Sequence, residues 1–296
     1  MLTWWRRRFW KRDEAALAEL HGLQPATLIT GATRGIGYEF ARMVVRSGGG
    51  VVLIARSESD LQRVRDRLLA EAKDATDHTT PSITTIAIDL TGVDAASSIR
   101  DQLGTLNLYI DTLINNAGVG LSGHFADQPP AQIDHLVELN ISALTRLTQT
   151  FLPDMLVRGH GGIINVASLG GLTPGPFQAA YYASKAYVIS LTQALSYENR
   201  GQGVRFTVIA PGPVETQFHA QMDAERAFYR RFLPAMTARA VARSTMFWYK
   251  LGRTVVVPGV FNTILAICLR ILPAPLTSPV VAFLLNPRDD EKGHSE

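Results

Sequence analysis

Tyr181 and Lys185 are the pair of residues whose types and spacing most directly suggest chemistry. They are four positions apart in a stretch with helical apolar spacing, so the ammonium is expected beside the phenol on one helix face. A neighbouring cation favours the phenolate, which predicts a tyrosine pKa lowered from about 10 toward working pH. Such a phenol can act as a general acid or base. Tyr182 also lies near Lys185 in the sequence and competes for this role.

Two further polar residues belong to the same candidate site. Ser168 follows the apolar run 162–166, so it is expected at the carboxyl end of a parallel strand, where sheets of this type place their chemistry. Its hydroxyl could hold a carbonyl oxygen beside Tyr181; a turn-forming serine before Gly170 is the alternative. Asn140 is a polar residue within an apolar helix, and by itself it indicates only a helix-bending amide.

A glycine-rich loop, Thr30-Gly-Ala-Thr-Arg-Gly-Ile-Gly37, joins an apolar strand to an amphipathic helix. Glycines let the backbone approach a phosphate, and the helix N-terminus offers free N–H groups and a positive dipole end. The spacing Gly-x-x-x-Gly-x-Gly is not the commoner dinucleotide fingerprint, so a plain glycine turn is the alternative. The strand before the loop and the helix after it favour dinucleotide binding.

The end of the second strand indicates which dinucleotide binds. An NAD-binding sheet carries an acidic residue there for the adenosine ribose, whereas this chain has Ala55 followed by Arg56. Together with Arg34, Arg56 could bind a 2′-phosphate in the bidentate manner of guanidinium groups. We therefore predict NADP(H) in preference to NAD(H); two solvated surface arginines are the alternative.

The elements that must position these residues alternate along the chain. Short β-branched runs, typical of strands buried on both faces, occupy 26–30, 50–55, 83–88, 110–114, 162–166, 204–209 and 254–257. Stretches with helical spacing occupy 35–47, 57–73, 91–103, 131–157, 178–199 and 215–251, the second with Ser57 and Ser59 as candidate caps. This alternation predicts an α/β domain with a doubly wound, seven-stranded parallel sheet.

Six motifs in order resemble those of the short-chain dehydrogenase/reductase family over about residues 25–258. They are the glycine loop 30–37, Asn115-Asn116-Ala117-Gly118, Asn140, Ser168, Tyr181-x-x-x-Lys185 and Pro211-Gly212. The resemblance implies a single-domain Rossmann fold with strand order 3-2-1-4-5-6-7. Its spacing favours Tyr181 over Tyr182, which we interpret as a packing residue.

The resemblance also implies roles for individual residues. The catalytic set would be Asn140, Ser168, Tyr181 and Lys185, with Asn140 holding a water that links Lys185 to solvent. The implied cofactor-binding set is Gly31, Thr33, Arg34, Gly35, Ile36, Gly37, Arg56, Asp89, Leu90, Asn116, Ala117, Gly118, Tyr181, Lys185, Pro211, Gly212, Val214 and Thr216. Asp89 and Leu90 would lie near the adenine, 116–118 on the adenosine side, and 211–216 at the nicotinamide carboxamide.

The expected reaction is hydride transfer between nicotinamide and a carbonyl or secondary alcohol, with Tyr181 as proton donor and Ser168 orienting the oxygen. One alternative is an extended-type epimerase or dehydratase, although those enzymes usually have Gly-x-x-Gly-x-x-Gly and a larger C-terminal domain. A second alternative is a catalytically silent cofactor-binding scaffold, against which the intact catalytic set argues. The resemblance further implies a homo-oligomer formed through the helices of Asn140 and Tyr181.

Composition excludes several classes of protein. The chain has 296 residues, 46% of them hydrophobic, and a formal net charge of +3, as expected of an ordinary globular protein. Its single cysteine, Cys268, cannot form an intramolecular disulfide and favours a reducing, cytoplasmic location. Cysteine and histidine spacings indicate no metal site. The basic residues match no nucleic-acid-reading module, so no nucleic-acid partner is expected.

The two ends of the chain suggest contact with lipid. Residues 1–24 form a leader that interleaves five cations with Trp4, Trp5, Phe9 and Trp10, which fits either a membrane-surface segment or a solvated leader, and it is no secretory signal. The extension 259–296 is apolar up to about Leu285, and its prolines argue against a spanning helix. A last strand followed by a buried or surface-docked helix is expected.

The segment after Thr216 is expected to close over the substrate. Its apolar residues Phe218, Phe228, Phe232, Met236, Phe247 and Trp248 could then form a lipophilic pocket wall. We therefore expect a lipid-like ketone, handled by a protein that associates reversibly with an anionic membrane surface.

Overall fold

The core of the protein is a seven-stranded parallel sheet at the centre of a computed structural model, which describes residues 22–73, 81–216 and 235–286. The strands are β1 (Gln24–Thr30), β2 (Gly50–Ala55), β3 (Ile83–Ala87), β4 (Leu108–Asn115), β5 (Gly161–Val166), β6 (Val204–Ile209) and β9 (Val255–Val256). Their order is β3-β2-β1-β4-β5-β6-β9. β9 is the seventh strand expected from the sequence, so the predicted fold and strand order are confirmed.

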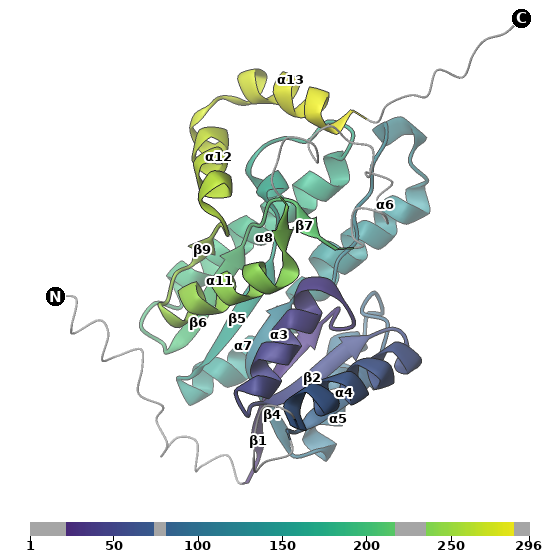
Figure 1. Ribbon diagram of the computed structural model, residues 1–296, viewed down its shortest axis with the longest axis vertical. Helices are drawn as coiled ribbons and strands as arrows, with labels where there is room; N and C mark the ends of the chain where they lie inside the picture. Colours follow the sequence, from purple (N-terminus) through teal and green to yellow (C-terminus); the bar gives the residue numbers. More distant parts are fainter. Residues whose placement is uncertain (1–21, 74–80, 217–234, 287–296) are drawn as a thin grey trace, which may run out of the picture.

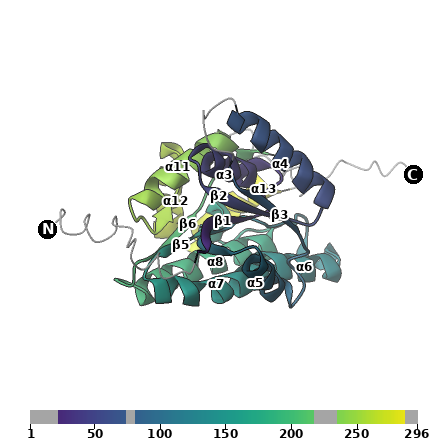
Figure 2. The same ribbon diagram turned by 90° about the horizontal axis from the view of Figure 1, so that it is seen from below.

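Helices cover both faces of the sheet (Figure 2). One layer contains α3 (Gly35–Arg46), α4 (Glu58–Lys73) and α11 (Ala238–Lys250), and the other contains α5 (Ala95–Thr105), α7 (Leu144–Arg158) and α8 (Ala179–Glu198). Leu53 packs into the first layer and Leu113 into the second, each with no exposed surface. Strand residues alternate between two apolar layers, which explains why the strands are apolar throughout.

The predicted helix over 131–157 is interrupted at its centre. α6 (Pro130–Val137) and α7 are joined by a π-helical turn, Glu138–Ala143, which holds Asn140. Such turns are frequent at functional sites. Of the two candidate caps of α4, Ser57 accepts a hydrogen bond from the Asp60 N–H at 3.2 Å.

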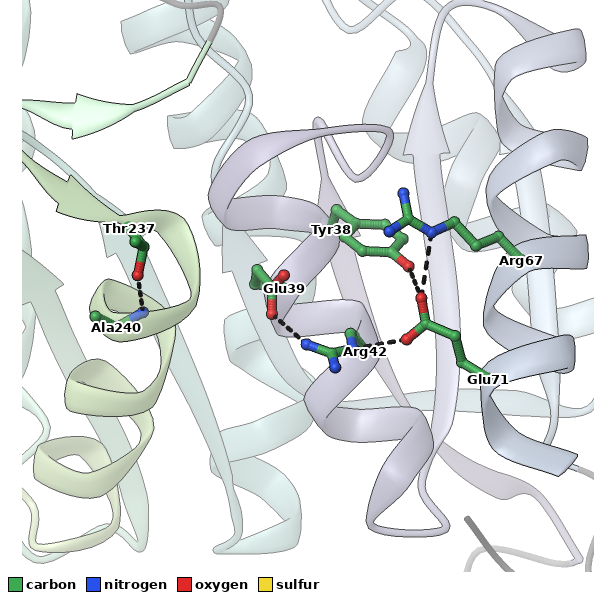
Figure 3. A network of polar contacts seen from close by, with 7 residues as sticks. All are labelled: Tyr38, Glu39, Arg42, Arg67, Glu71, Thr237 and Ala240. Atoms are coloured by element: carbon green, nitrogen blue, oxygen red, sulfur yellow. Dashed lines mark hydrogen bonds and ion pairs between the residues drawn. The ribbon is translucent and has the colours of Figure 1, made fainter. Parts of the chain in front are cut away.

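The prediction of a single helix over 215–251 is wrong. The described part of this segment contains two short paired strands, β7 (Val214–Glu215) and β8 (Met236–Thr237), before α11 begins. Thr237 caps α11 by accepting a hydrogen bond from the Ala240 N–H at 3.2 Å (Figure 3). A side-chain cap of this kind ends extended backbone and starts a helix. Phe218, Phe228 and Phe232 lie outside the described residues.

Two C-terminal helices, α12 (Val260–Ile271) and α13 (Ala274–Leu285), lie beyond the carboxyl end of the sheet (Figure 1). Pro273 separates them, because a proline favours an extended residue before it and starts the next helix after it. The expected apolar extension is therefore two helices rather than one. Within the described ranges, no helix is both long and apolar enough to span a membrane. The leader predicted over 1–24 lies almost wholly outside the described residues.

Candidate active site

A cavity of about 1420 Å³ opens at the carboxyl ends of the strands, and it gathers nearly all of the predicted site residues. Those that line it are Gly31, Thr33, Arg34, Gly35, Ile36, Arg56, Asp89, Leu90, Asn116, Ala117, Gly118, Ser168, Tyr181, Lys185, Pro211, Gly212, Val214 and Thr216. Gly37 and Asn140 do not line the cavity, and both are buried. The fold thus brings segments spread over 186 positions, from 31 to 216, to one site.

The glycine loop has the backbone that its sequence suggests. Gly31 and Gly35 have φ values of +63° and +57°, in the left-handed region that favours glycine. A Cβ on Gly37 would clash with the Gly31 carbonyl and lie 2.5 Å from Asn116 Nδ2. α3 starts at Gly35, within the loop, and has no acidic residue in its first turn to repel an anion.

Thr30 and Asn116 brace this loop against the end of β4. The Thr30 hydroxyl accepts hydrogen bonds from the N–H groups of Asn116 and Ala117, both at 2.9 Å. Asn116 Nδ2 in turn donates to the Thr30 and Gly31 carbonyls at 3.0 and 3.1 Å. The family resemblance implies that Asn116 lies on the adenosine side of the cofactor. The structure shows in addition that Asn116 fixes the shape of the glycine loop.

The ends of β2 and β3 place a cation, Arg56, and an anion, Asp89, in the wall of the cavity. Asp89 accepts hydrogen bonds from the Thr91 N–H and hydroxyl at 3.0 and 2.9 Å. The Thr91 N–H contributes most to the lowered pKa of Asp89, and the charge of Arg56 also contributes. Arg56 and Arg34 are exposed and line the cavity. Two guanidinium groups therefore border this end, as the prediction for a 2′-phosphate requires.

An ionic network holds the helix behind the glycine loop against α4 (Figure 3). Glu71 accepts hydrogen bonds from the Tyr38 hydroxyl at 2.7 Å, from Arg42 at 2.7 Å and from Arg67 at 3.2 Å. Burial, followed by the hydrogen bond to Glu71, raises the pKa of Tyr38 to about 12, so this phenol stays a donor. Arg67 also lines the cavity, which the sequence analysis did not anticipate.

Ser168 and Tyr181 form a hydrogen-bonded pair in the wall of the cavity. Tyr181 lies in the first turn of α8 and Ser168 directly before a 3₁₀ turn, Leu169–Leu172, where its hydroxyl also accepts a hydrogen bond from the Gly170 N–H at 3.1 Å. The turn-forming and catalytic interpretations of Ser168 are therefore compatible. Lys185, one turn further along α8, donates to the Val166 carbonyl at 3.1 Å.

The predicted lowering of the Tyr181 pKa is wrong. Burial raises the pKa of Tyr181 to about 12, although the hydrogen bond with Ser168 opposes the rise. Lys185 Nζ lies 5.7 Å from the centre of the Tyr181 ring, and burial lowers its own pKa to about 8. Desolvation disfavours the charged form of each group, so it raises the pKa of Tyr181 and lowers that of Lys185. Tyr181 is therefore a protonated phenol at neutral pH, which suits a proton donor.

The Asn140 side chain binds the backbone after β4 and the Ser184 side chain of α8. Its Oδ1 accepts from the Val119 N–H at 2.9 Å, and its Nδ2 donates to the Val119 carbonyl at 2.8 Å and to the Ser184 hydroxyl at 3.1 Å. A Cβ on Gly118 would lie 3.0 Å from Asn140 Oδ1 and 3.4 Å from Lys185 Nζ, so both side chains border this glycine. The predicted water-holding role of Asn140 stays a prediction.

A buried amide chain that the sequence analysis missed anchors α8 to the sheet. Asn115 Nδ2 donates to Asn165 Oδ1 at 2.9 Å, and Asn165 Nδ2 donates to the Thr192 hydroxyl at 2.9 Å. Asn165 is fully buried in β5. A single asparagine in an apolar strand was the available signal. This chain fixes where Tyr181 and Lys185 lie relative to the strand ends.

The wall of the cavity beyond Tyr181 comes from the two C-terminal helices. It includes the apolar side chains Leu265, Leu269, Leu272, Leu276, Val280, Val281, Leu284 and Leu285, together with Cys268 and Thr277. Thr277 is tied to the loop after Ser168 through a hydrogen bond between the Thr277 and Thr173 hydroxyls at 3.1 Å. An apolar stretch interrupted by prolines was the signal in the sequence.

The prediction of a lipophilic wall formed by the segment after Thr216 is wrong for Met236, Phe247 and Trp248, the three of its residues that the structure describes. Among its described members, Met236 and Trp248 pack against the core beside α3, and Phe247 is 58% exposed. None of the three lines the cavity. Tyr182, by contrast, lines the cavity and packs against Val281 and Leu285 of α13, which agrees with its interpretation as a packing residue.

Comparison with known proteins agrees with this architecture. The sequence profile described as short chain dehydrogenase matches residues 25–227. The chain belongs to the short-chain dehydrogenase/reductase family. Among relatives, the ketoacyl reductase HetN of Nostoc sp. is 36% identical over 187 residues, which is 63% of this chain. The aligned part spans 62% of the Nostoc protein, about three fifths of its length.

Solved structures of short-chain dehydrogenases have the same fold. The short-chain dehydrogenase from Sphingobium yanoikuyae, solved in complex with NADPH, has a TM-score of 0.72 at 26% identity and covers 92% of this chain and 100% of its own. The bulky-bulky ketone specific alcohol dehydrogenase from Comamonas testosteroni has a TM-score of 0.67 at 27% identity, covering 84% and 95%. The predicted membership of an oxidoreductase family is confirmed.

Proposed function

We propose that this short-chain dehydrogenase/reductase is an NADP(H)-dependent reductase of lipophilic ketones, able to oxidise the corresponding secondary alcohols. The observation that carries the proposal is that the glycine loop, the Ser168–Tyr181 pair and apolar side chains of α12 and α13 all line one cavity. One end of the cavity suits a dinucleotide, its centre suits proton transfer, and its far wall suits hydrocarbon.

NADP(H) fits the residues at the dinucleotide end. The glycine loop and the start of α3 would hold the pyrophosphate, Arg34 and Arg56 the 2′-phosphate, and Asp89 and Leu90 the adenine. Pro211, Gly212, Val214 and Thr216 would contact the nicotinamide carboxamide. The NADPH bound to the Sphingobium relative supports this choice of cofactor. When bound, the cofactor supplies or accepts the hydride.

Tyr181 gives its proton to the carbonyl oxygen of the substrate in the reductive direction. Its raised pKa keeps that proton available at neutral pH, and Ser168 donates to the same oxygen and orients it. Lys185, whose pKa of about 8 leaves it largely protonated at neutral pH, holds the nicotinamide ribose hydroxyls. The positive charge of Lys185 also stabilises the phenolate that forms when Tyr181 gives up its proton.

A ketone panel tests the function. The full chain is mixed with NADPH and each ketone, and NADPH absorbance is followed; the panel contains long-chain and polycyclic ketones, 3-oxoacyl thioesters and short hydrophilic ketones as the control group. We expect higher kcat/KM for the lipophilic members, since each buried methylene contributes about 0.8 kcal/mol. NADPH binding without turnover of any ketone would instead indicate the cofactor-binding scaffold.

We also propose that α12 and α13 place the cavity at an anionic membrane surface. Nine of the eighteen exposed large hydrophobic residues of the described chain lie between positions 260 and 285, and the only charged side chain there is Arg270. Three of these exposed residues, Leu272, Leu276 and Val280, also line the cavity, so a lipophilic substrate has an apolar path from lipid to the site. The five cations near the N-terminus complement anionic lipid. Homo-oligomerisation through the helices of Asn140 and Tyr181 stays a separate proposal.

Co-sedimentation with vesicles tests this contact. The full chain should pellet with phosphatidylcholine vesicles that contain phosphatidylglycerol, less with phosphatidylcholine alone, and less as salt screens the charges. Ile271→Asp, at a position 74% exposed on α12, should reduce the pelleted fraction severalfold, whereas the control Val157→Asp, at a position 89% exposed on α7, should not. Equal pelleting of both variants, or none at low salt, would contradict the proposal. Equal pelleting after removal of residues 1–12 would exclude the leader alone.

A further inference from the structure

Gln178 lines the cavity, and its buried side-chain nitrogen has no hydrogen-bond partner among the described residues. The Gln178 side chain is 3% exposed. A buried amide N–H that makes no hydrogen bond destabilises a protein, so such a group calls for an explanation. In the cavity, a bound molecule can supply the missing acceptor.

The backbone holds Gln178 in a fixed position. It is the N-cap residue of α8; its N–H donates to the Gly175 carbonyl at 3.1 Å, and its carbonyl accepts from the Tyr182 N–H at 2.9 Å. Its side chain makes no capping hydrogen bond to the helix. Tyr181 is three residues later, and side chains three apart at the start of a helix are neighbours. Gln178 and Tyr181 therefore both line the cavity from the start of α8.

The surroundings of Gln178 belong to the substrate half of the cavity. The preceding residue, Phe177, has a φ of +66° and its carbonyl accepts from the Gly123 N–H at 2.8 Å. Phe177 packs against Val281 and Leu285 of α13, the helix of the apolar wall. Gln178 thus lines the same cavity as the Ser168–Tyr181 pair and directly follows a residue that packs against the apolar wall.

A second buried glutamine shows what a structural amide looks like in the same region. Gln128 is 8% exposed, and its Nε2 donates to the Gly123 carbonyl at 2.9 Å. Gln128 does not line the cavity. Its donor group fastens a loop, whereas the donor group of Gln178 is left for a ligand.

We propose that Gln178 is a specificity-determining residue, whose Nε2 donates a hydrogen bond to a second acceptor of the substrate, close to the carbonyl that is reduced. This inference rests on the proposed function. A ligand that fits has a ketone at Tyr181, an acyl carbonyl at Gln178 that is separated from the ketone by one methylene, and a hydrocarbon chain on the other side of the ketone, against α12 and α13. That is the chemistry of a 3-oxoacyl thioester or ester.

A pair of substrates that differ only in the second acceptor tests the inference. One is a 3-oxoacyl thioester and the other a ketone of matched chain length without the acyl carbonyl, each assayed with NADPH. Gln178→Met keeps the length of the side chain and removes the donor, and Gln128→Met is the matched control. We expect Gln178→Met to lower kcat/KM about tenfold for the thioester and less than twofold for the plain ketone, because a site that donates to an acceptor discriminates against a substrate that lacks it.

The other results separate a structural role from recognition. Equal losses of kcat/KM for both substrates in Gln178→Met, or a higher Kd for NADPH, would show that the amide supports the fold or the cofactor. No loss of kcat/KM for either substrate would show that the amide contacts no substrate. Each of these results overturns the inference. Gln128→Met should change the midpoint of thermal unfolding without changing the ratio of kcat/KM for the thioester to kcat/KM for the plain ketone. If the unmodified protein reduces neither ketone, the proposed function has failed, whereas reduction of both with an unchanged ratio in Gln178→Met refutes Gln178 alone.

Discussion

Tyr181→Phe should lower kcat for ketone reduction about 10³-fold and leave the Kd for NADPH within about twofold. The substitution removes only the hydroxyl that gives up the proton, and positioned proton transfer contributes roughly 10²–10⁴-fold to rate. The ring stays buried, and Lys185 keeps its place one turn along α8 and its hydrogen bond to Val166. Stopped-flow or steady-state assays with NADPH, paired with fluorescence titration of the cofactor, measure the two quantities.

Tyr182→Phe is the matched control for this experiment, because it removes a hydroxyl from the adjacent residue of the same helix. Tyr182 packs against α13, so its variant should change KM for lipophilic ketones more than kcat. The assignment of the proton donor would be refuted if Tyr182→Phe lost turnover and Tyr181→Phe kept most of it.

Arg56→Asp should reverse the choice of cofactor. Hydrogen bonds to charged groups contribute about 1.5–3 kcal/mol, so kcat/KM for NADPH should fall about 10- to 100-fold. The new carboxylate repels a 2′-phosphate and can accept hydrogen bonds from the ribose hydroxyls of NADH, so kcat/KM for NADH should rise. Because Arg56 is exposed, the effect should be largest at low ionic strength.

Arg65→Asp controls for the change in net charge, since Arg65 is an exposed residue of α4 that does not line the cavity. It should leave the ratio of kcat/KM values for the two cofactors unchanged. An unmodified protein that used NADPH and NADH equally well would refute the assignment of Arg34 and Arg56 to a 2′-phosphate.

Much of the fold could be predicted from the sequence because its signals are local. β-Branched runs separated by helical spacing identify a doubly wound sheet, and the strand order follows from the resemblance carried by the glycine loop, Asn116 and Tyr181-x-x-x-Lys185. A glycine loop between a strand and a helix can only lie at the carboxyl end of that strand. The gathering of residues 31–216 around one cavity is therefore a consequence of topology.

The pKa of Tyr181 could not be predicted from the sequence. Helical spacing placed Lys185 beside it and suggested a lowered pKa, but the pKa depends on how deeply the phenol is buried. Burial is a property of the packed fold, to which Val119, Leu121 and Leu136 contribute from distant segments. The helix predicted over 215–251 was wrong for a similar reason, because β8 exists only by pairing with β7.

By itself, then, the sequence predicted the fold class, which the structure confirms, and a dinucleotide end, because both rest on residue type and near-neighbour spacing. The choice of Ser168, Tyr181 and Lys185 as a catalytic set follows from the family resemblance and stays a prediction. The tertiary structure alone decided that α12 and α13 line the cavity, that Met236, Phe247 and Trp248 do not, and that Gln178 Nε2 has no partner among the described residues. These outcomes depend on contacts between residues that are far apart in the chain, and no local pattern encodes which apolar surface packs over which site.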